Sequence, residues 1–148
     1  MKLDFFNIGE NTKKVIIVDE YQKSITKGAL NKKIKIITNF FYDYSVIVII
    51  ADNCLDFIAG YLAALNKKNT ITILLDKSFS LNYIEKVISL YKPNIVYSPL
   101  NLSFSKLKIL SFFNLKNYKI LNTNFNLRKN LNFSNFLLLS TSGTTESP

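Results

Sequence analysis

The stretch Ser45-Val46-Ile47-Val48-Ile49-Ile50-Ala51 decides the fold, together with the polar pair Asp52-Asn53 that follows it. The stretch is too apolar for the alternating pattern of a half-exposed strand, and it predicts a strand that is covered on both faces. Asp52-Asn53 is expected to cap a helix that starts just after the strand. The buried stripe of that helix is predicted from residues at helical spacing, namely Leu55, Ile58, Leu62 and Leu65.

The same alternation continues toward the C-terminus. Residues 70–75 predict a second strand, and residues 81–91 predict a second helix, which is capped from the turn at 78–80 and stopped by Pro93. Residues 94–97 predict a third strand. Strand, helix, strand, helix, strand at this spacing favours right-handed βαβ units, so the predicted class is α/β with a mostly parallel sheet and flanking helices. The inward face of the second helix is predicted to carry Ile84, Val87, Ile88 and Tyr91.

The N-terminal part of the chain predicts one strand and one helix. Residues 15–18 are β-branched and predict the strand. Thr26 is a suitable N-cap for a helix that runs to about Phe41. The buried face of this helix is predicted from Leu30, Ile34, Ile37 and Phe41.

The connection after the third strand of the core gives weaker signals. Ser103 or Ser105 is a suitable cap for a helix through about Phe113. Residues 118–121 predict a strand, and the Asn-rich segment 122–135 predicts a loop.

A last predicted strand at residues 136–139 runs into a segment of Ser, Thr and Gly at 140–145. Gly143 permits positive φ or a close approach of a ligand to the backbone. Successive N–H groups in such a turn form a concavity that binds anions, and neighbouring hydroxyls add donors. Each charge-assisted bond to a phosphate contributes about 1.5–3 kcal/mol, so several together are enough to hold a triphosphate. The candidate phosphate-binding residues are Thr141, Ser142, Gly143, Thr144 and Thr145.

Two familiar motifs are excluded for this segment. It lacks the second Gly and the Lys of a Walker loop, and it lacks the G-x-S-x-G pattern of a nucleophile elbow. On the physics alone, an ordinary polar loop is the alternative to a phosphate-binding loop.

Composition limits the chemistry further. The chain has 148 residues, which fits one domain or a piece of a larger one. It contains no His, which excludes a His general base, a Ser–His triad and a His-ligated metal. Cys54 is the only cysteine, which excludes a disulfide framework and a Cys-cluster zinc site. We expect Cys54 to be a packed small residue and not a reactive thiol.

The sequence shows no membrane or export signal. Asp4 and Asn7 lie where a signal peptide needs an apolar run, and no apolar run approaches the ~20 residues of a spanning helix. A lone thiol is compatible with a reducing cytosol, so the expected localisation is cytoplasmic.

The segment Thr141-Ser142-Gly143-Thr144-Thr145-Glu146-Ser147-Pro148 resembles a known signature. It is similar to T-S-G-[ST]-T-G-x-P-K-G, the phosphate-loop signature of the adenylate-forming, or AMP-binding, superfamily, which includes acyl-CoA synthetases and adenylation domains of peptide synthetases. Four upstream segments resemble family motifs in the same order: 24–30 resembles S-x-T-Y-G-E-L, 46–65 the V-A-L-L-L-P-N-S-x-E-F segment with its Ala-rich helix, 74–78 P-L-D-P-S, and 92–96 the helix-to-strand turn.

The resemblance implies one partial domain over residues 1–148, the opening part of the large N-terminal domain of an adenylate-forming enzyme. Its expected parts are an N-terminal strand and helix at 1–44, a βαβαβ core at 45–98, a variable connection at 99–135, and a strand with the phosphate loop at 136–148.

The resemblance also implies an ATP-dependent ligase that activates carboxylic acids. In the family, a carboxylate attacks the α-phosphate of Mg-ATP, pyrophosphate leaves, and the thiol of CoA or a carrier protein usually takes the acyl group. ATP and Mg²⁺ are therefore the implied cofactors. A carboxylic acid and CoA or a carrier protein are the implied partners of the full-length enzyme.

Carried onto this chain, the residues from Thr141 to Thr145 hold the leaving pyrophosphate, and the chain supplies no catalytic residue and no metal ligand. Glu146 departs from the usual Gly of the signature and brings a carboxylate near the phosphates. The later family motifs lie beyond Pro148, so the chain alone is expected to be an inactive fragment.

Two other classes of function stay open. A basic nucleic-acid binder is suggested by the net charge of +9 and by the absence of acids between Glu85 and Glu146. The scarcity of Arg makes nucleic acid the less favoured partner. The stacking groups of this nucleic-acid binder would be Tyr83, Tyr91, Tyr97 and Tyr118. The second alternative is a non-catalytic α/β interaction module.

Overall fold

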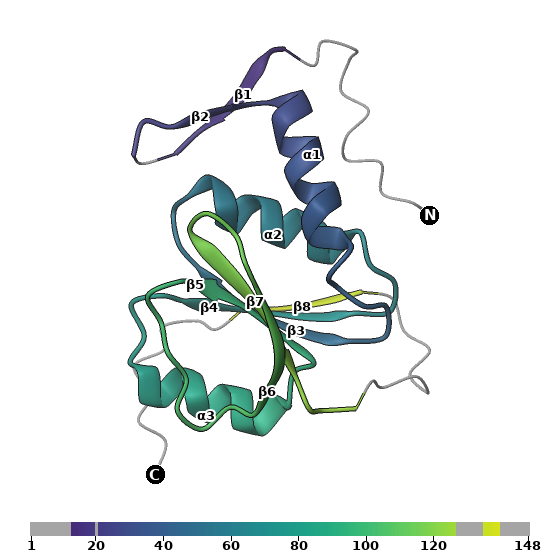
Figure 1. Ribbon diagram of the computed structural model, residues 1–148, viewed down its shortest axis with the longest axis vertical. Coiled ribbons are helices and arrows are strands. Elements are labelled where there is room, and N and C mark those ends of the chain that lie inside the picture. Colours follow the sequence, from purple (N-terminus) through teal and green to yellow (C-terminus); the bar gives the residue numbers. More distant parts are fainter. Residues whose placement is uncertain (1–12, 20, 127–134, 140–148) are drawn as a thin grey trace.

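A six-stranded sheet forms the centre of the protein in the computed structural model, which describes residues 13–19, 21–126 and 135–139 (Figure 1). The strands of the sheet are β3 (Val46–Ala51), β4 (Ile71–Asp76), β5 (Ile95–Pro99), β6 (Ile109–Asn114), β7 (Tyr118–Thr123) and β8 (Phe136–Leu139). The helices are α1 (Lys27–Thr38), α2 (Leu55–Leu65) and α3 (Leu81–Tyr91). A separate antiparallel hairpin, β1 (Val15–Val18) and β2 (Ser24–Thr26), precedes α1.

The strand order is β6-β7-β5-β3-β4-β8. β3 runs parallel to β4 and β5, and β8 runs parallel to β4. β7 is antiparallel to β5, and β6 is antiparallel to β7. The prediction of an α/β protein with βαβ units and a mostly parallel sheet is therefore confirmed, with an antiparallel hairpin added at one edge.

The helices cover opposite faces of the sheet. α1 and α2 lie over one face, and α3 lies over the other (Figure 1). Successive side chains of β3 follow this division, since Ile47 and Ile49 pack toward α1 and α2 while Val48 and Ile50 pack toward α3. The strand is buried on both faces, as its continuous apolar sequence predicts.

The connections leave β3 and β4 toward different faces. β3 leads into α2 on one face, and β4 leads into α3 on the other. A crevice outside the carboxyl ends of such strands is the usual ligand site of an open α/β sheet. The carboxyl ends of the parallel strands lie toward the left of the sheet in Figure 1.

The expected buried stripe of α2 is wrong. Leu55, Ile58 and the two later leucines of that stripe are only half-buried. The face that is fully buried carries small residues together with one acid, namely Asp56, Ala59, Gly60, Ala63 and Ala64. This face carries small side chains because α2 lies close to the aromatic ring of Tyr97. A Cβ on Gly60 would be only 2.0 Å from that ring.

The predicted N-cap of α2 is also wrong. Cys54 occupies the cap position and makes no capping hydrogen bond with its side chain. Pairing of β3 with β4 extends to Ala51 opposite Asp76, which places the turn at residues 52–53. The carboxylate of Asp52 then pairs with the ammonium group of Lys77.

The other two helices agree more closely with their patterns. Thr26 caps α1 by accepting a hydrogen bond from the N–H of Ala29, but the helix ends at Thr38, before Phe41, which is nevertheless buried. Ser80 caps α3 in the same way, at the N–H of Tyr83. In α3, Ile84 and Ile88 are buried as predicted, whereas Tyr91 is partly exposed and Glu85 is buried.

The predicted helix from Ser103 or Ser105 through Phe113 does not form. Residues 109–114 are strand β6, which pairs with β7. Ser105 does not cap a helix, because its N–H and hydroxyl donate to Oε1 of Glu85 at 2.8 and 3.2 Å. Within the described segments, no helix combines the length and the apolar character needed to cross a bilayer.

Candidate functional site

The predicted phosphate-binding residues, Thr141, Ser142, Gly143, Thr144 and Thr145, lie outside the described residues. The structure does describe the strand that leads to them. β8 pairs in parallel with β4 from Phe136 opposite Ile71 to Leu139 opposite Leu74. The last described residue of β8 therefore lies near the carboxyl edge of the parallel strands.

Asn135 positions the start of β8. Its side-chain oxygen accepts from the N–H of Thr70 at 3.1 Å, and its amide nitrogen donates to the carbonyl of Lys67 at 2.6 Å. The N–H of Phe136 then donates to the carbonyl of Thr70 at 2.9 Å. These bonds set the register of β8 against β4.

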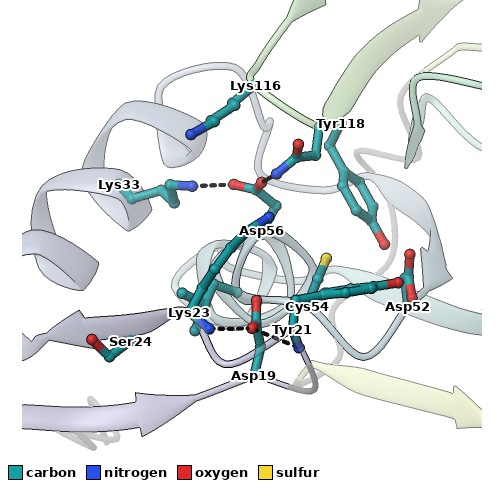
Figure 2. Close-up of a pocket in the computed structure, with 12 residues that line it drawn as sticks. Asp19, Tyr21, Lys23, Ser24, Lys33, Asp52, Cys54, Asp56, Lys116 and Tyr118 are labelled. Atoms are coloured by element: carbon teal, nitrogen blue, oxygen red, sulfur yellow. Dashed lines mark hydrogen bonds and ion pairs between the residues drawn. The ribbon is translucent and has the colours of Figure 1, made fainter.

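A pocket of about 470 Å³ opens beside the carboxyl end of β3 (Figure 2). Its lining comes from the β1–β2 hairpin, α1, the residues that follow β3, the start of α2, and the turn between β6 and β7. These elements are far apart in sequence. The pocket is therefore a product of the tertiary fold, and its volume suits a small-molecule ligand.

Asp56 is the most deeply buried charged group among the residues that line the pocket. Only 2% of the residue is exposed, and it lies in the first turn of α2, where the helix dipole favours an anion. The ammonium group of Lys33 on α1 forms an ion pair with its Oδ1, and the amide nitrogen of Asn117 donates to its Oδ2. Both carboxylate oxygens thus have a donor, as burial of a charge requires.

Two tyrosines lie behind this cluster and pack against each other. The rings of Tyr97 and Tyr118 have centroids 4.6 Å apart. The hydroxyl of Tyr97 donates to the carbonyl of Asp56, and that of Tyr118 to the carbonyl of Ile50, each at 2.8 Å. Burial raises the pKa of both phenols above the ordinary value, so both remain protonated donors.

The positions of these tyrosines correct one expectation. Tyr97 and Tyr118 are buried and are not accessible to nucleic-acid bases, although both belong to the set suggested for stacking. Tyr83 and Tyr91 of that set are partly exposed on α3. A stacking platform of four tyrosines is therefore not present.

Cys54 lines the pocket as a buried free thiol. Burial raises the pKa of the thiol above its ordinary value, although the N–H groups of Phe57 and Asp56 partly oppose this. A thiol with a raised pKa is a poor nucleophile at neutral pH, in keeping with the expected packing role.

The other acids of the pocket have defined structural partners. Asp19 accepts hydrogen bonds from the N–H groups of Tyr21 and Lys23, at 3.0 and 2.9 Å, and so fixes the turn between β1 and β2. Asp52 pairs with Lys77 across the ends of β3 and β4. In the part of the chain that the structure describes, no group of three or more His, Cys, Asp or Glu side chains is arranged to hold a metal ion.

Sequence reasoning missed this pocket. The sequence patterns marked neither Asp56 nor Lys33 as a binding residue. The one usable signal was an acid on the face of α2 that also carries Ala59, Gly60 and Ala63. An acid on a small-residue face is unusual, and it indicates a buried partner.

No family model and no curated protein matches the sequence. Solved structures of adenylate-forming enzymes do share the fold. Apo MatB from Rhodopseudomonas palustris matches 64% of this chain and 20% of its own, with a TM-score of 0.55 and 15% identity. VinN matches 58% of this chain and 23% of its own, with a TM-score of 0.50 and 14% identity.

The structural matches confirm the fold that the sequence resemblance implied. The matched region corresponds to part of the N-terminal domain of adenylate-forming enzymes. It spans about a fifth of the length of the two solved chains. At this level of identity the likeness is one of fold.

Proposed function

We propose that the chain is part of an ATP-dependent ligase that activates carboxylic acids by forming acyl-adenylates. The observation that carries the proposal is the placement of β8, which runs parallel to β4 and whose last residue, Leu139, lies near the carboxyl edge of the parallel strands. Ligands of open α/β sheets bind at this edge, and the Ser/Thr/Gly segment follows β8 directly. The shared fold of the adenylate-forming enzymes supports the same function.

In this proposal, Thr141, Ser142, Gly143, Thr144 and Thr145 bind the β- and γ-phosphates of Mg-ATP. Backbone N–H and hydroxyl donors that are fixed before the reaction stabilise the charge that develops on the leaving pyrophosphate. The Mg²⁺ ion enters with the nucleotide as part of the substrate. A carboxylic acid is the second substrate, and CoA or a carrier protein is the acceptor of the acyl group.

Nucleotide binding by the chain tests the proposal. Titration of the protein with Mg-ATP and with Mg-pyrophosphate in a calorimeter is expected to show saturable binding of both. Thr144→Ala removes one donor to a phosphate and is expected to weaken binding about tenfold, since a bond to a charged group contributes about 1.5–3 kcal/mol. Ser89→Ala removes a hydroxyl from the exposed side of α3 and is the matched control, with unchanged affinity expected.

Binding is the property to measure first, because the matched region spans about a fifth of the solved relatives. Equal affinity of Thr144→Ala and the wild type for both ligands would contradict the assignment of the loop. Absence of any nucleotide binding would favour a non-catalytic α/β module that keeps the fold without the chemistry.

A further inference from the structure

We propose that the pocket beside β3 binds one oxyanion, a carboxylate or a phosphate, of a small molecule between the ammonium groups of Lys33 and Lys116. This site is separate from residues 141–145, and it does not depend on the nucleotide-binding proposal. The argument rests on the charges of the pocket, on the geometry of the Asp56 cluster and on the character of the pocket walls.

The pocket is lined by three aspartates and three lysines, and they differ in how far protein partners engage them. The acids that line it are Asp19, Asp52 and Asp56, and each already accepts from protein donors. Among the described residues the ion pairs are those of Lys33 with Asp56 and of Lys77 with Asp52. The ammonium groups of Lys23 and Lys116 therefore line the pocket without a carboxylate partner in the described chain.

The ammonium groups of Lys33 and Lys116 lie at the same end of the pocket, beside Asp56 (Figure 2). Asp56 holds Lys33 at the base of the pocket, but an ammonium group has three donors and this ion pair uses only one of them. Lys116 comes from the turn between β6 and β7, and in Figure 2 its ammonium group points toward the space beside Asp56 and Lys33. An oxyanion at this point would receive donors from two lysines, with one buried carboxylate holding the first of them in place.

The walls of the pocket allow an apolar body to accompany the oxyanion. Leu55 is half-buried and contributes apolar surface, and the exposed Tyr21 lines the pocket from the β1–β2 hairpin. A volume of about 470 Å³ is larger than a single phosphate or carboxylate needs. The ligand class is therefore a small organic acid or phosphate ester with a hydrophobic or aromatic part.

The test uses benzoate and phenyl phosphate as probes, because they share an aromatic body and differ in the oxyanion. Each is titrated into the isotope-labelled full chain at constant ionic strength, and the backbone amide signals are followed by NMR. Saturable shifts are expected at residues 54–57 and 115–118 with at least one probe, and the stronger of the two identifies the preferred oxyanion. Benzamide, which carries no charge, is expected to give no saturable shift.

Lys116→Gln is the decisive variant, because Lys116 is exposed and has no ion pair among the described residues. It is expected to weaken probe binding at least fivefold while leaving the melting temperature unchanged. Lys86→Gln makes the same change of charge on the exposed surface of α3 and is expected to bind the probe as the wild type does.

The outcomes separate this site from the proposed phosphate loop. In Thr144→Ala the shifts at residues 54–57 and 115–118 are expected to persist, and in Lys116→Gln the affinity for Mg-ATP is expected to stay the same. Loss of the probe shifts in Thr144→Ala would overturn the proposal. Equal binding by Lys116→Gln and the wild type, equal binding of benzamide, or no saturable shift with either probe would overturn it as well.

Discussion

The two faces of the sheet differ in the size and polarity of the side chains that they bury. Beneath α1 and α2, small residues such as Ala59 and Ala63 meet the rings of Tyr97 and Tyr118. Beneath α3, the buried side chains are mostly aliphatic, such as Val48, Ile84 and Ile88. The first face also contains Asp56 and the pocket, whereas the acid buried on the α3 side is Glu85, which accepts from Ser105 and Lys106.

The difference shows how one face can combine a core with a binding site. Small helix residues let α2 approach the sheet closely, and the phenol hydroxyls satisfy the carbonyls of Asp56 and Ile50 behind the pocket. The face beneath α3 also buries one carboxylate, Glu85, but the side chains packed there are mostly aliphatic and stabilise it chiefly by apolar burial. The two faces should therefore respond differently to changes of side-chain volume.

The largest effect is expected from removal of volume on the aliphatic face. Ile84 is fully buried in α3, and Ile84→Ala leaves a cavity there, so we expect a loss of about 3 kcal/mol in the free energy of unfolding. Urea denaturation measures this quantity. Leu90→Ala on the same helix is the control, since Leu90 is 71% exposed and its truncation is expected to change stability by less than about 0.5 kcal/mol. Similar losses for both variants would contradict the burial of Ile84.

A gain of volume should be harmful on the small-residue face. A Cβ at residue 60 would lie 2.0 Å from Cε1 of the buried Tyr97 ring, so Gly60→Ala requires the ring or the helix to move. We expect a loss of about 2 kcal/mol, despite the better helix propensity of Ala.

A double-mutant cycle in urea sharpens the test of Gly60. In a Tyr97→Leu background the ring is gone, and Gly60→Ala is expected to cost less than in the wild type. Gly28→Ala in the first turn of α1 is the matched control, with little change expected. An equal cost of Gly60→Ala in both backgrounds would show that the ring is not what excludes a side chain.

The smallest effect is a dependence of stability on pH that comes from Glu85, an acid buried in α3. Burial raises the pKa of Glu85, but the N–H groups of Lys106 and Ser105 and the hydroxyl of Ser105 lower it by more, so the net pKa lies below the ordinary 4.5. The contribution of Glu85 is complete above pH 4.5 and is lost as the pH falls through the lower folded pKa.

Denaturation in urea between pH 2.5 and pH 6 measures this dependence. Glu85→Gln is expected to make the acid-side fall in stability shallower, and the remaining fall includes Asp76, whose pKa is lowered by the N–H and hydroxyl of Ser78. An unchanged pH profile for Glu85→Gln would contradict the role of Ser105 and Lys106 as its partners.

The sequence predicted most of the parallel part of the fold. The apolar run at residues 46–51 and the helical spacing in residues 81–91 are local patterns, and each gave an element close to its observed bounds. The segment through Phe113 was wrong because its apolar residues fit a helix nearly as well as a strand. Residues 109–114 form a strand because they pair with β7, which lies further along the chain.

The sequence by itself therefore determined the order of strands and helices, because a period of two or of 3.6 residues is a property of neighbouring positions. Only the tertiary structure decided which face of α2 is buried and that Lys33, Asp56 and Asn117 meet in one pocket. These residues lie on three separate elements, and their distances depend on how α1, α2 and the β6–β7 turn pack. No local pattern encodes such a meeting, because the free energy of burying Asp56 depends on donors that the fold alone brings to it.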